Sequence, residues 1–211
     1  MGILKSGLLG PFRNKVGGVI GRSHRGQNVM TSLHEKRNNR FSKEQLEAQE
    51  KFALLNGFLS EIDRLINIGF KPLKRSQSPV NAAFSYNYPH AFTETSEKLS
   101  LNYPQLIYSR GPIFTSEGTS AAVTGTDIIL TWMAQPQSSY CQYTDLATCL
   151  AYCPAKEKSV KFTGATARHT LNYTMKMPRD FAGKLVHCYM SFNSADGKRT
   201  GDSIYIGEVL L

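Results

Sequence analysis

The residues of this chain that could bind an anionic group are concentrated near its start. Residues 10–26 read GPFRNKVGGVIGRSHRG and combine glycine, arginine and lysine without any acidic residue. Residues 1–40 contain eight Lys or Arg residues and one acid, Glu35, so they carry +7 of the net charge of +9. The candidate assembly or polyanion-binding residues are Arg13, Lys15, Gly17, Gly18, Gly21, Arg22, Arg25, Gly26, Lys36, Arg37 and Arg40.

Glycine-rich basic segments can hold phosphate groups, but this segment matches neither common nucleotide motif. A P-loop needs G-x-x-x-x-G-K-[ST], so that backbone N–H groups and the lysine contact the phosphates. The nearest segment, GGVIGRS at residues 17–23, lacks that spacing, and G-x-G-x-x-G is absent as well. We therefore expect no cofactor and no small-molecule substrate, and we expect these glycines to allow positive φ angles, bulges or close backbone approach.

The histidines and cysteines are not spaced for catalysis or metal binding. His187 and Cys188 are neighbours, so on a strand their side chains point to opposite faces. The other histidines show no metal-ligand spacing, and no G-x-S-x-G motif occurs: His24, His34, His90 and His169. The sequence therefore predicts no metal site and a protein that is not an enzyme.

The four cysteines, Cys141, Cys149, Cys153 and Cys188, do not have the spacing of a disulfide framework. Cys149 and Cys153 flank the expected strand LAY, which would separate their Cα atoms by about 13 Å. A disulfide requires Cα atoms within about 7 Å. We therefore expect buried free thiols and a reducing folding environment.

The elements that would position the basic segment can be read from the local pattern. Residues 15–33 read as two short strands around the turn RSHRG, with Val16 and Gly18 on one face of the first strand. Ser42 and Gln45 have the spacing of a helix capping box, with Phe41 and Leu46 as a hydrophobic staple. These signals precede one long amphipathic helix, which we expect to run from Lys43 to Ile68 and to be ended by Gly69. Gly57 lies inside this helix, where glycine is unfavourable, so we expect a close packing partner at that position.

The rest of the chain predicts a β-rich fold. Residues 104–111 (PQLIYSRG) read as a strand, and from residue 120 onward about six strands alternate with turn signals. The fold class is therefore mainly β with one long α-helix and an Ig/fibronectin type III-like β-sandwich. The expected domains are residues 1–75 (basic hairpin and helix), 76–118 (a connecting segment with a strand) and 119–211 (the β-sandwich).

Several motifs together resemble those of a known family. They include GLLGPFRNKVGGVIGRSHRGQNVMTSL, SKEQLEAQEKFALLNGFL, INIGF, NAAFSYN, YSRG and ADGKRTGDSIYIG. The chain resembles, over essentially its whole length, an uncharacterised family of Bacteroidetes proteins with a domain of unknown function. A second similarity, to the start of some phage virion-associated proteins, implies an assembly element and rests on Asn14, Lys15, Val16, Gly17, Arg25, Gly26, Gln49, Lys51 and Phe52.

Composition and pattern together favour a structural or interaction protein. A short exposed hairpin has free backbone edges that can add to another sheet. We therefore expect a homo-oligomer or polymer held by the N-terminal hairpin and helix. The first alternative is a nucleic-acid-binding protein that uses the basic 40 residues, although no aromatic stacking residues occur in residues 13–40. The second is an adhesin or carbohydrate-binding module with an exposed cluster of Tyr86, Tyr88 and Tyr103.

The sequence contains no membrane-spanning signal. No apolar run approaches the roughly 18 residues that a membrane helix needs. No Sec-type export signal is visible either. We therefore expect no membrane span and a cytoplasmic location, with release by lysis or by a non-Sec route as the alternative.

Overall fold

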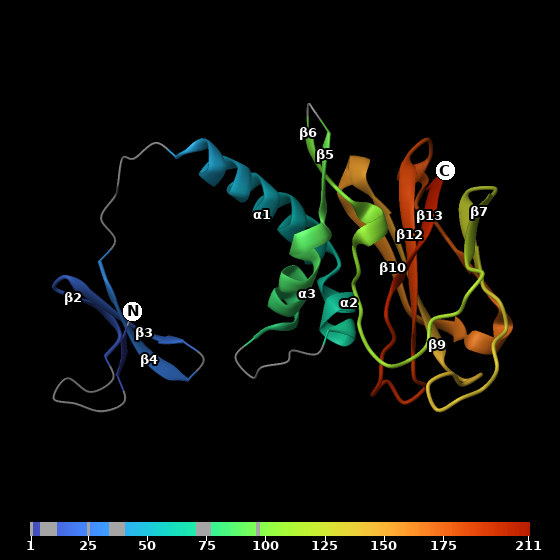
Figure 1. The fold of residues 1–211 in the computed structure, drawn as a ribbon, viewed down its shortest axis with the longest axis horizontal. Helices are drawn as coiled ribbons and strands as arrows, with labels where there is room; N and C mark the ends of the chain where they lie inside the picture. The colour runs from blue at the N-terminus through green and yellow to red at the C-terminus, as the bar shows by residue number, and fades with distance from the viewer. Residues whose placement is uncertain (1, 5–11, 25, 34–40, 71–76, 96–97) are drawn as a thin grey trace. The chain divides into compact units, whose positions relative to one another are not determined.

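The computed structural model describes residues 2–4, 12–24, 26–33, 41–70, 77–95 and 98–211. The chain forms two compact units, Met1–Gln45 and Leu46–Leu211. Within the described residues it is mainly β, with four sheets and three α-helices (Figure 1). The domain boundaries at residues 75 and 118 stay predictions.

The N-terminal unit is built around a four-stranded antiparallel sheet in the order β1-β4-β3-β2. Its strands are β1 (Gly2–Leu4), β2 (Asn14–Val16), β3 (Val19–His24) and β4 (Gln27–Ser32). The predicted hairpin is therefore present as β3 and β4. The prediction that Val16 and Gly18 lie on one strand was wrong, because Val16 pairs with Val19 and leaves Gly17 and Gly18 as a two-residue turn.

The single long helix predicted for residues 43–68 is divided in two. Helix α1 (Lys43–Glu61) is followed by α2 (Asp63–Gly69), and Ile62 between them has φ −107° and ψ 21°. The backbone carbonyl of Glu61 accepts a hydrogen bond from Lys161 Nζ. This contact gives the carbonyl a partner outside the helix, as expected where a side chain enters the i→i−4 ladder.

The start of α1 agrees with the sequence. Gln45 N donates to Ser42 Oγ at 3.3 Å, and Ser42 N donates to Gln45 Oε1 at 3.0 Å. This reciprocal pair is the predicted capping box. The predicted hydrophobic staple would bury Phe41 and Leu46 against each other. The two side chains are instead 60% and 53% exposed.

The two helical glycines have opposite environments. A Cβ atom at Gly57 would meet nothing within 4 Å, so the predicted close packing partner is absent among the described residues. At Gly69, which ends α2 instead of following it, a Cβ would lie 2.6 Å from Ser109 Cβ. Gly69 is therefore required by the close approach of the segment that contains Ser109.

Replacing Gly57 by alanine is expected to raise the free energy of unfolding by about 0.5–1 kcal/mol, because alanine restricts the unfolded chain and favours the helix. The matched Gly69→Ala variant is expected to lower that free energy, because its Cβ would collide with Ser109. Urea unfolding curves of both variants measure the two changes. A loss of stability in Gly57→Ala would contradict the open environment of that residue.

Besides the two-stranded β5-β6 sheet, the C-terminal unit contains two larger antiparallel sheets, in the orders β10-β9-β12-β13 and β11-β8-β7. The strands of the first sheet are β9 (Leu146–Cys153), β10 (Lys158–Ala167), β12 (Leu185–Asn193) and β13 (Ile204–Leu210). Those of the second are β7 (Ser120–Thr124), β8 (Asp127–Thr131) and β11 (Asn172–Met175). The six stretches predicted as strands after residue 120 therefore all contain strands, and β7 is an additional one.

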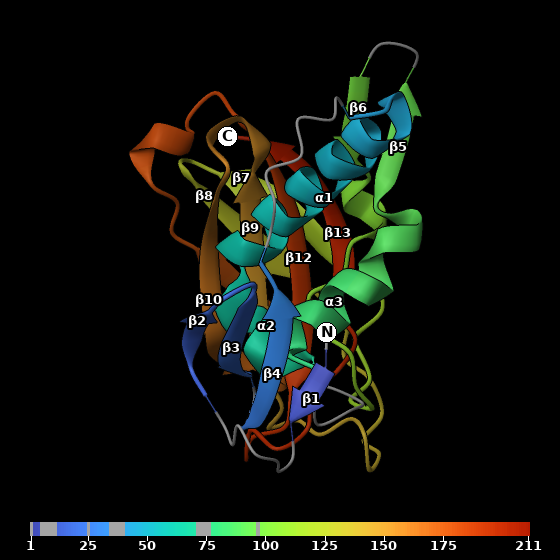
Figure 2. The ribbon, with the colours of Figure 1, turned by 90° about the vertical axis from the view of Figure 1, so that its left-hand side faces the viewer.

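The larger sheet is covered on both faces. Cys149, Ala151 and Cys188 belong to one hydrophobic cluster, which also contains side chains of the smaller sheet. Leu150 and Tyr189 belong to a second cluster, formed with the helices. The figures show α1, α2 and α3 (Pro79–Asn87) on one side of the larger sheet and β7 and β8 on the other (Figure 1 and Figure 2). Burial on both faces explains why LATCLAYC is apolar without strict alternation.

The strand predicted at residues 104–111 is absent. The described strands between the helices and β7 form the hairpin β5 (Phe92–Thr95) and β6 (Lys98–Leu101). In the 104–111 segment, side chains satisfy several of the backbone N–H groups, and the N–H of Arg110 donates to the backbone oxygen of Gly69. Asn87 Oδ1 accepts from Ile107 N at 2.9 Å, and Ser203 Oγ accepts from Tyr108 N at 2.8 Å. The segment therefore follows an irregular path with its polar backbone groups paired.

Candidate functional site

The basic residues of the N-terminal sheet give the first candidate site. Lys15 pairs with Ile20 across β2 and β3, and Arg22 is two residues beyond Ile20 on β3. Paired residues and residues two apart share a face of a sheet, so Lys15 and Arg22 lie on the same face. Both side chains are exposed, as is Arg13. The other predicted basic residues lie outside the described residues: Arg25, Lys36, Arg37 and Arg40.

The glycines of this sheet have the backbone roles expected from the sequence. Gly17 and Gly26 have φ angles of +59° and +76°, in the left-handed region that glycine enters without strain. At Gly21 a Cβ atom would lie 2.4 Å from the backbone oxygen of Phe12. Gly18 has open space around it. The sequence therefore supplies glycine for the β2–β3 turn, for the residue before β4 and for the close approach of Phe12.

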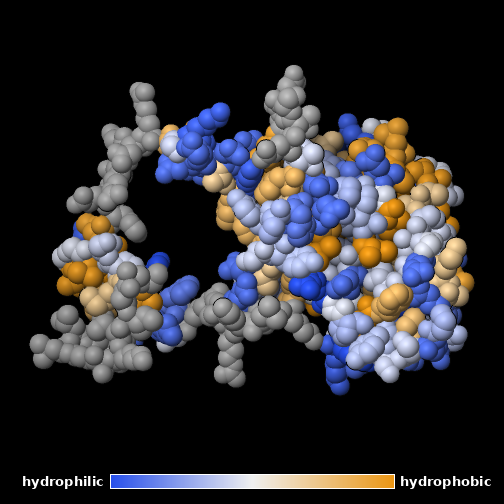
Figure 3. Space-filling view, in the orientation of Figure 1, coloured by the Kyte–Doolittle hydropathy of each residue, from blue (hydrophilic) through white to orange (hydrophobic). Residues whose placement is uncertain are grey.

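Strand β2 is an edge strand of this sheet within the described residues. It pairs only with β3 in the order β1-β4-β3-β2, so one side of Asn14–Val16 has no strand partner. Val16 on this strand is 61% exposed, and the space-filling view shows hydrophobic next to polar side chains on the visible face of the N-terminal unit (Figure 3). The free side of β2 can accept a further strand, with Lys15 beside it.

A second candidate site lies at one end of the C-terminal unit, around a buried ion pair. Arg168 and Asp145 are each 2% exposed, and Arg168 Nη2 lies 3.2 Å from Asp145 Oδ2. The same guanidinium donates to Ser116 Oγ at 3.1 Å and to Phe114 O at 2.6 Å, and lies 3.8 Å from the centre of the Phe192 ring. Burial lowers the pKa of Arg168, although nearby Asp145 opposes the shift.

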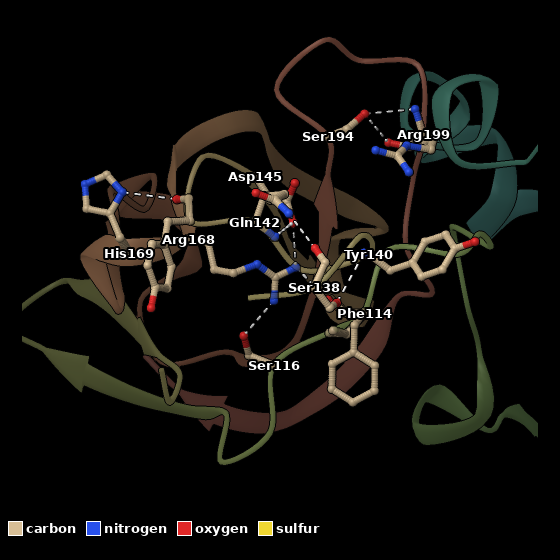
Figure 4. A network of polar contacts seen from close by, with 12 residues as sticks. Phe114, Ser116, Ser138, Tyr140, Gln142, Asp145, Arg168, His169, Ser194 and Arg199 are labelled. Atoms are coloured by element: carbon tan, nitrogen blue, oxygen red, sulfur yellow. Dashed lines mark hydrogen bonds and ion pairs between the residues drawn. The ribbon is translucent and has the colours of Figure 1, made fainter. Parts of the chain in front are cut away.

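This network joins loops that are far apart in the sequence (Figure 4). Trp132 Nε1 donates to Arg168 O at 2.8 Å, and Gln142 N donates to Asp145 Oδ2 at 2.8 Å. Arg199 Nη1 donates to Ser139 O at 3.2 Å. The ion pair therefore joins the loops after β8 and β10, and the Arg199 hydrogen bond connects the loop after β12 to the loop after β8. Sequence reasoning missed it, because the two charges are 23 positions apart and no local pattern connects them.

The outer surface of these loops exposes apolar side chains. Phe114, Met133, Tyr140 and Tyr143 are 51%, 63%, 51% and 49% exposed. Figure 4 shows the rings of Phe114 and Tyr140 directed away from the Arg168 guanidinium. Three of the four residues line a groove of about 540 Å³. This end of the unit therefore has a surface on which a ligand could stack.

Comparison of the sequence with protein-family models decides the family. The model described as a family of unknown function (DUF6266) matches residues 10–207, which is nearly the whole chain. The chain belongs to DUF6266. A comparison with curated proteins gave no match. The predicted membership of an uncharacterised family is therefore confirmed, whereas the Bacteroidetes source and the similarity to phage virion proteins stay predictions.

The thiols of this DUF6266 chain are buried. Cys141, Cys149, Cys153 and Cys188 are all free and inaccessible, which confirms the prediction of buried free thiols. Burial raises the pKa of Cys149 to about 12 and that of Cys188 to about 12. At neutral pH these two groups are protonated and therefore poor nucleophiles.

Among the described histidines of the DUF6266 chain, His187 is buried and is part of an aromatic cluster. His187 is 5% exposed, its ring stacks on Tyr103 at 4.0 Å, and its Nδ1 lies 3.0 Å from Tyr205 Oη. Burial lowers the pKa of His187, against the opposing effect of Glu208. Within the described ranges, no group of three or more His, Cys, Asp or Glu residues could hold a metal ion. No described helix is long and apolar enough to cross a membrane.

Proposed function

We propose that this chain is a non-enzymatic structural protein that assembles with further copies of itself through its N-terminal sheet and the adjoining part of α1. The observation that supports the proposal most directly is the free side of β2, with the exposed side chains of Lys15 and Arg22 on one face of the same sheet. Strand addition to such an edge supplies affinity through backbone hydrogen bonds, and the side chains supply specificity. The start of α1 exposes the apolar side chains of Leu46 and Phe52, which could supply a separate contact with another copy.

We propose further that the C-terminal sheets form an Ig/fibronectin type III-like β-sandwich that serves as the rigid module. Labelled A, B, C, C′, E, F and G in chain order, β7 to β13 give the sheets E-B-A and C′-C-F-G. In Ig-type sandwiches the C, F and G strands share one sheet, and A, B and E share the other. The strand order therefore supports this type, and the shared hydrophobic cluster between the sheets supports packing face to face.

The proposal is tested by the mass of the full-length protein in solution at low salt. We expect light scattering to give the mass of two or more chains for the wild type. Lys15→Glu/Arg22→Glu is expected to reduce this to one chain, because it reverses the exposed charges beside β2. Arg64→Glu/Lys176→Glu makes the same change of charge at two exposed residues of the other unit and is expected to assemble as the wild type does.

Binding to random DNA at two salt concentrations distinguishes the alternative function. Neutralisation of several phosphates makes binding fall steeply as salt rises. Tight, salt-sensitive binding by a monomeric wild type would overturn assembly in favour of a nucleic-acid-binding protein. A wild type that is monomeric and does not bind DNA would overturn both.

A second candidate is a binding module on the β-rich unit, such as an adhesin or carbohydrate-binding protein. The aromatic residues first considered for it are partly packed against other rings: Tyr86 and Tyr88 are each 38% exposed, and Tyr88 lies against Phe84 and Phe92. Tyr86 lies against Phe70 and His90, and Tyr103 stacks on His187. The exposed side chains at the loop end, Phe114 and Tyr140 among them, support this candidate better. Binding on a glycan array that is lost in Phe114→Ala/Tyr140→Ala would favour it.

A further inference from the structure

An acidic groove crosses the C-terminal unit beside α1. It has a volume of about 710 Å³ and lies between α1, β6 and the end of β9. Its lining includes Glu50, Glu61 and Glu157 but no lysine, arginine or histidine. In a protein with a net charge of +9, a groove with only acidic charges is unusual. Its charge therefore selects a positively charged occupant.

The groove also contains a tyrosine hydroxyl that forms no hydrogen bond with any described residue. Tyr152 lines the groove and is only 4% exposed, yet no described residue forms a hydrogen bond with its hydroxyl. Burial raises the pKa of Tyr152, and the neighbouring Tyr103, Glu157 and Glu61 raise it further. The hydroxyl therefore stays protonated near two carboxylates, and an occupant of the groove could provide the partner that it lacks.

Two of the three carboxylates also have no ion-pair partner within the part of the chain that the structure describes. Glu61 accepts hydrogen bonds from Ser159 and lies 3.2 Å from Lys161 Nζ. Burial raises the pKa of Glu61, but these partners outweigh it, so its pKa lies below the usual value. Glu50 and Glu157 have no ion-pair partner among the described residues. They can accept charged donors from another molecule without losing an internal contact.

The arrangement fits the side chains of lysine and arginine. The carboxylates are not grouped as metal ligands, because no described cluster could hold a metal ion. The rings of Phe58, Tyr103 and Tyr152 line the same groove, and aromatic faces attract lysine and arginine. Phe58 and Tyr152 are 4.9 Å apart and Tyr103 and Tyr152 are 5.7 Å apart, so the rings form a continuous wall. The carboxylates that line the same groove can accept charge-assisted hydrogen bonds.

We infer that this groove binds the basic face of the N-terminal sheet of another copy of the chain. The inference rests on the proposed function and names the receiving surface. Charge complementarity selects this occupant, because residues 1–40 carry +7 and expose Lys15 and Arg22 on one face. The donor and receiving surfaces are different, so the contact is heterologous and can repeat from copy to copy. The expected product is a head-to-tail chain that shortens as salt screens the charges.

The test is a complementation experiment with full-length variants. One variant carries Lys15→Glu/Arg22→Glu and keeps its groove; the other carries Glu50→Lys/Glu157→Lys and keeps its basic sheet. Each alone is expected to have the mass of one chain. Their equimolar mixture is expected to have the mass of two or more chains, because one intact donor surface meets one intact groove and the two charge-reversed surfaces also attract each other. Glu117→Lys/Asp180→Lys makes the same change of charge at two exposed residues outside the groove lining and is expected to assemble as the wild type does.

The outcomes separate this inference from the proposed function. If Glu50→Lys/Glu157→Lys assembles like the wild type while Lys15→Glu/Arg22→Glu does not, the proposed function stands and the groove is overturned as the receiving surface. A mixture that stays at the mass of one chain also overturns the groove. Tyr152→Phe, which removes only the unpartnered hydroxyl, is expected to weaken assembly severalfold without lowering the unfolding midpoint. An unchanged assembly constant in that variant would overturn the role of the hydroxyl.

Discussion

A Phe58→Ala variant is expected to lose about 3–5 kcal/mol of unfolding free energy. Phe58 on α1 is 2% exposed, and its ring centre lies 4.9 Å from that of Tyr152 and 6.4 Å from that of Tyr189. These two tyrosines come from β9 and β12, so Phe58 is the side chain through which α1 packs on the larger sheet. Its removal leaves a cavity lined by rigid rings that cannot close around it. Urea unfolding followed by circular dichroism measures the loss.

Phe52→Ala provides the matched control on the same helix. Phe52 is 54% exposed, although its ring lies 5.1 Å from that of Phe84. We expect a loss of about 1 kcal/mol or less, the usual range for a partly exposed aromatic pair. Equal losses in the two variants would contradict the packing of α1 on the sheet through Phe58.

Asp145→Ala is expected to cost about 3–5 kcal/mol of unfolding free energy, because it leaves the buried Arg168 charge without its carboxylate. Arg168 is 2% exposed and its Nε already lacks a hydrogen-bond partner, so the guanidinium has little means of compensation. The same substitution removes the acceptor of Gln142 N. Both losses act on the loops that the ion pair connects.

The surface pair Lys156–Asp180 supplies the control. Its charged atoms are 3.8 Å apart and both side chains are more than one third exposed. Asp180→Ala is therefore expected to change the unfolding free energy by about 1 kcal/mol or less. If chemical denaturation gives Asp145→Ala a similarly small cost, the Arg168–Asp145 pair does not hold the loops.

The parts of the fold that depend on local sequence were predictable. The capping box needs only Ser42 and Gln45, which are three residues apart. The strands after residue 120 are bounded by turn residues, and their apolar runs are long enough to identify them. The positive φ angles of Gly17 and Gly26 likewise follow from residue type. Each of these features is determined by contacts within a few residues.

The features that depend on distant contacts were missed. Helix α1 ends where Lys161, 100 positions away, binds the Glu61 carbonyl. The segment at residues 104–111 is not a strand because Ser203 supplies its hydrogen bonds. At the candidate site, the charges of Lys15 and Arg22 were predictable, but their common face depends on the β2–β3 pairing. The acidic groove draws residues from α1, β6 and β9, so no local pattern could indicate it.

Burial of the larger sheet on both faces restricts the register in which β9 can pair with its neighbouring strands. Cys149 and Ala151 point to one side of β9, whereas Leu150 and Tyr152 point to the other. A slip of one residue would reverse every side chain. The bulky Tyr152 would then enter a space shaped for alanine and thiol groups, and small side chains would face the rings of the helical side. The mismatch would arise on both faces at once, so β9 has a single acceptable alignment with its neighbours.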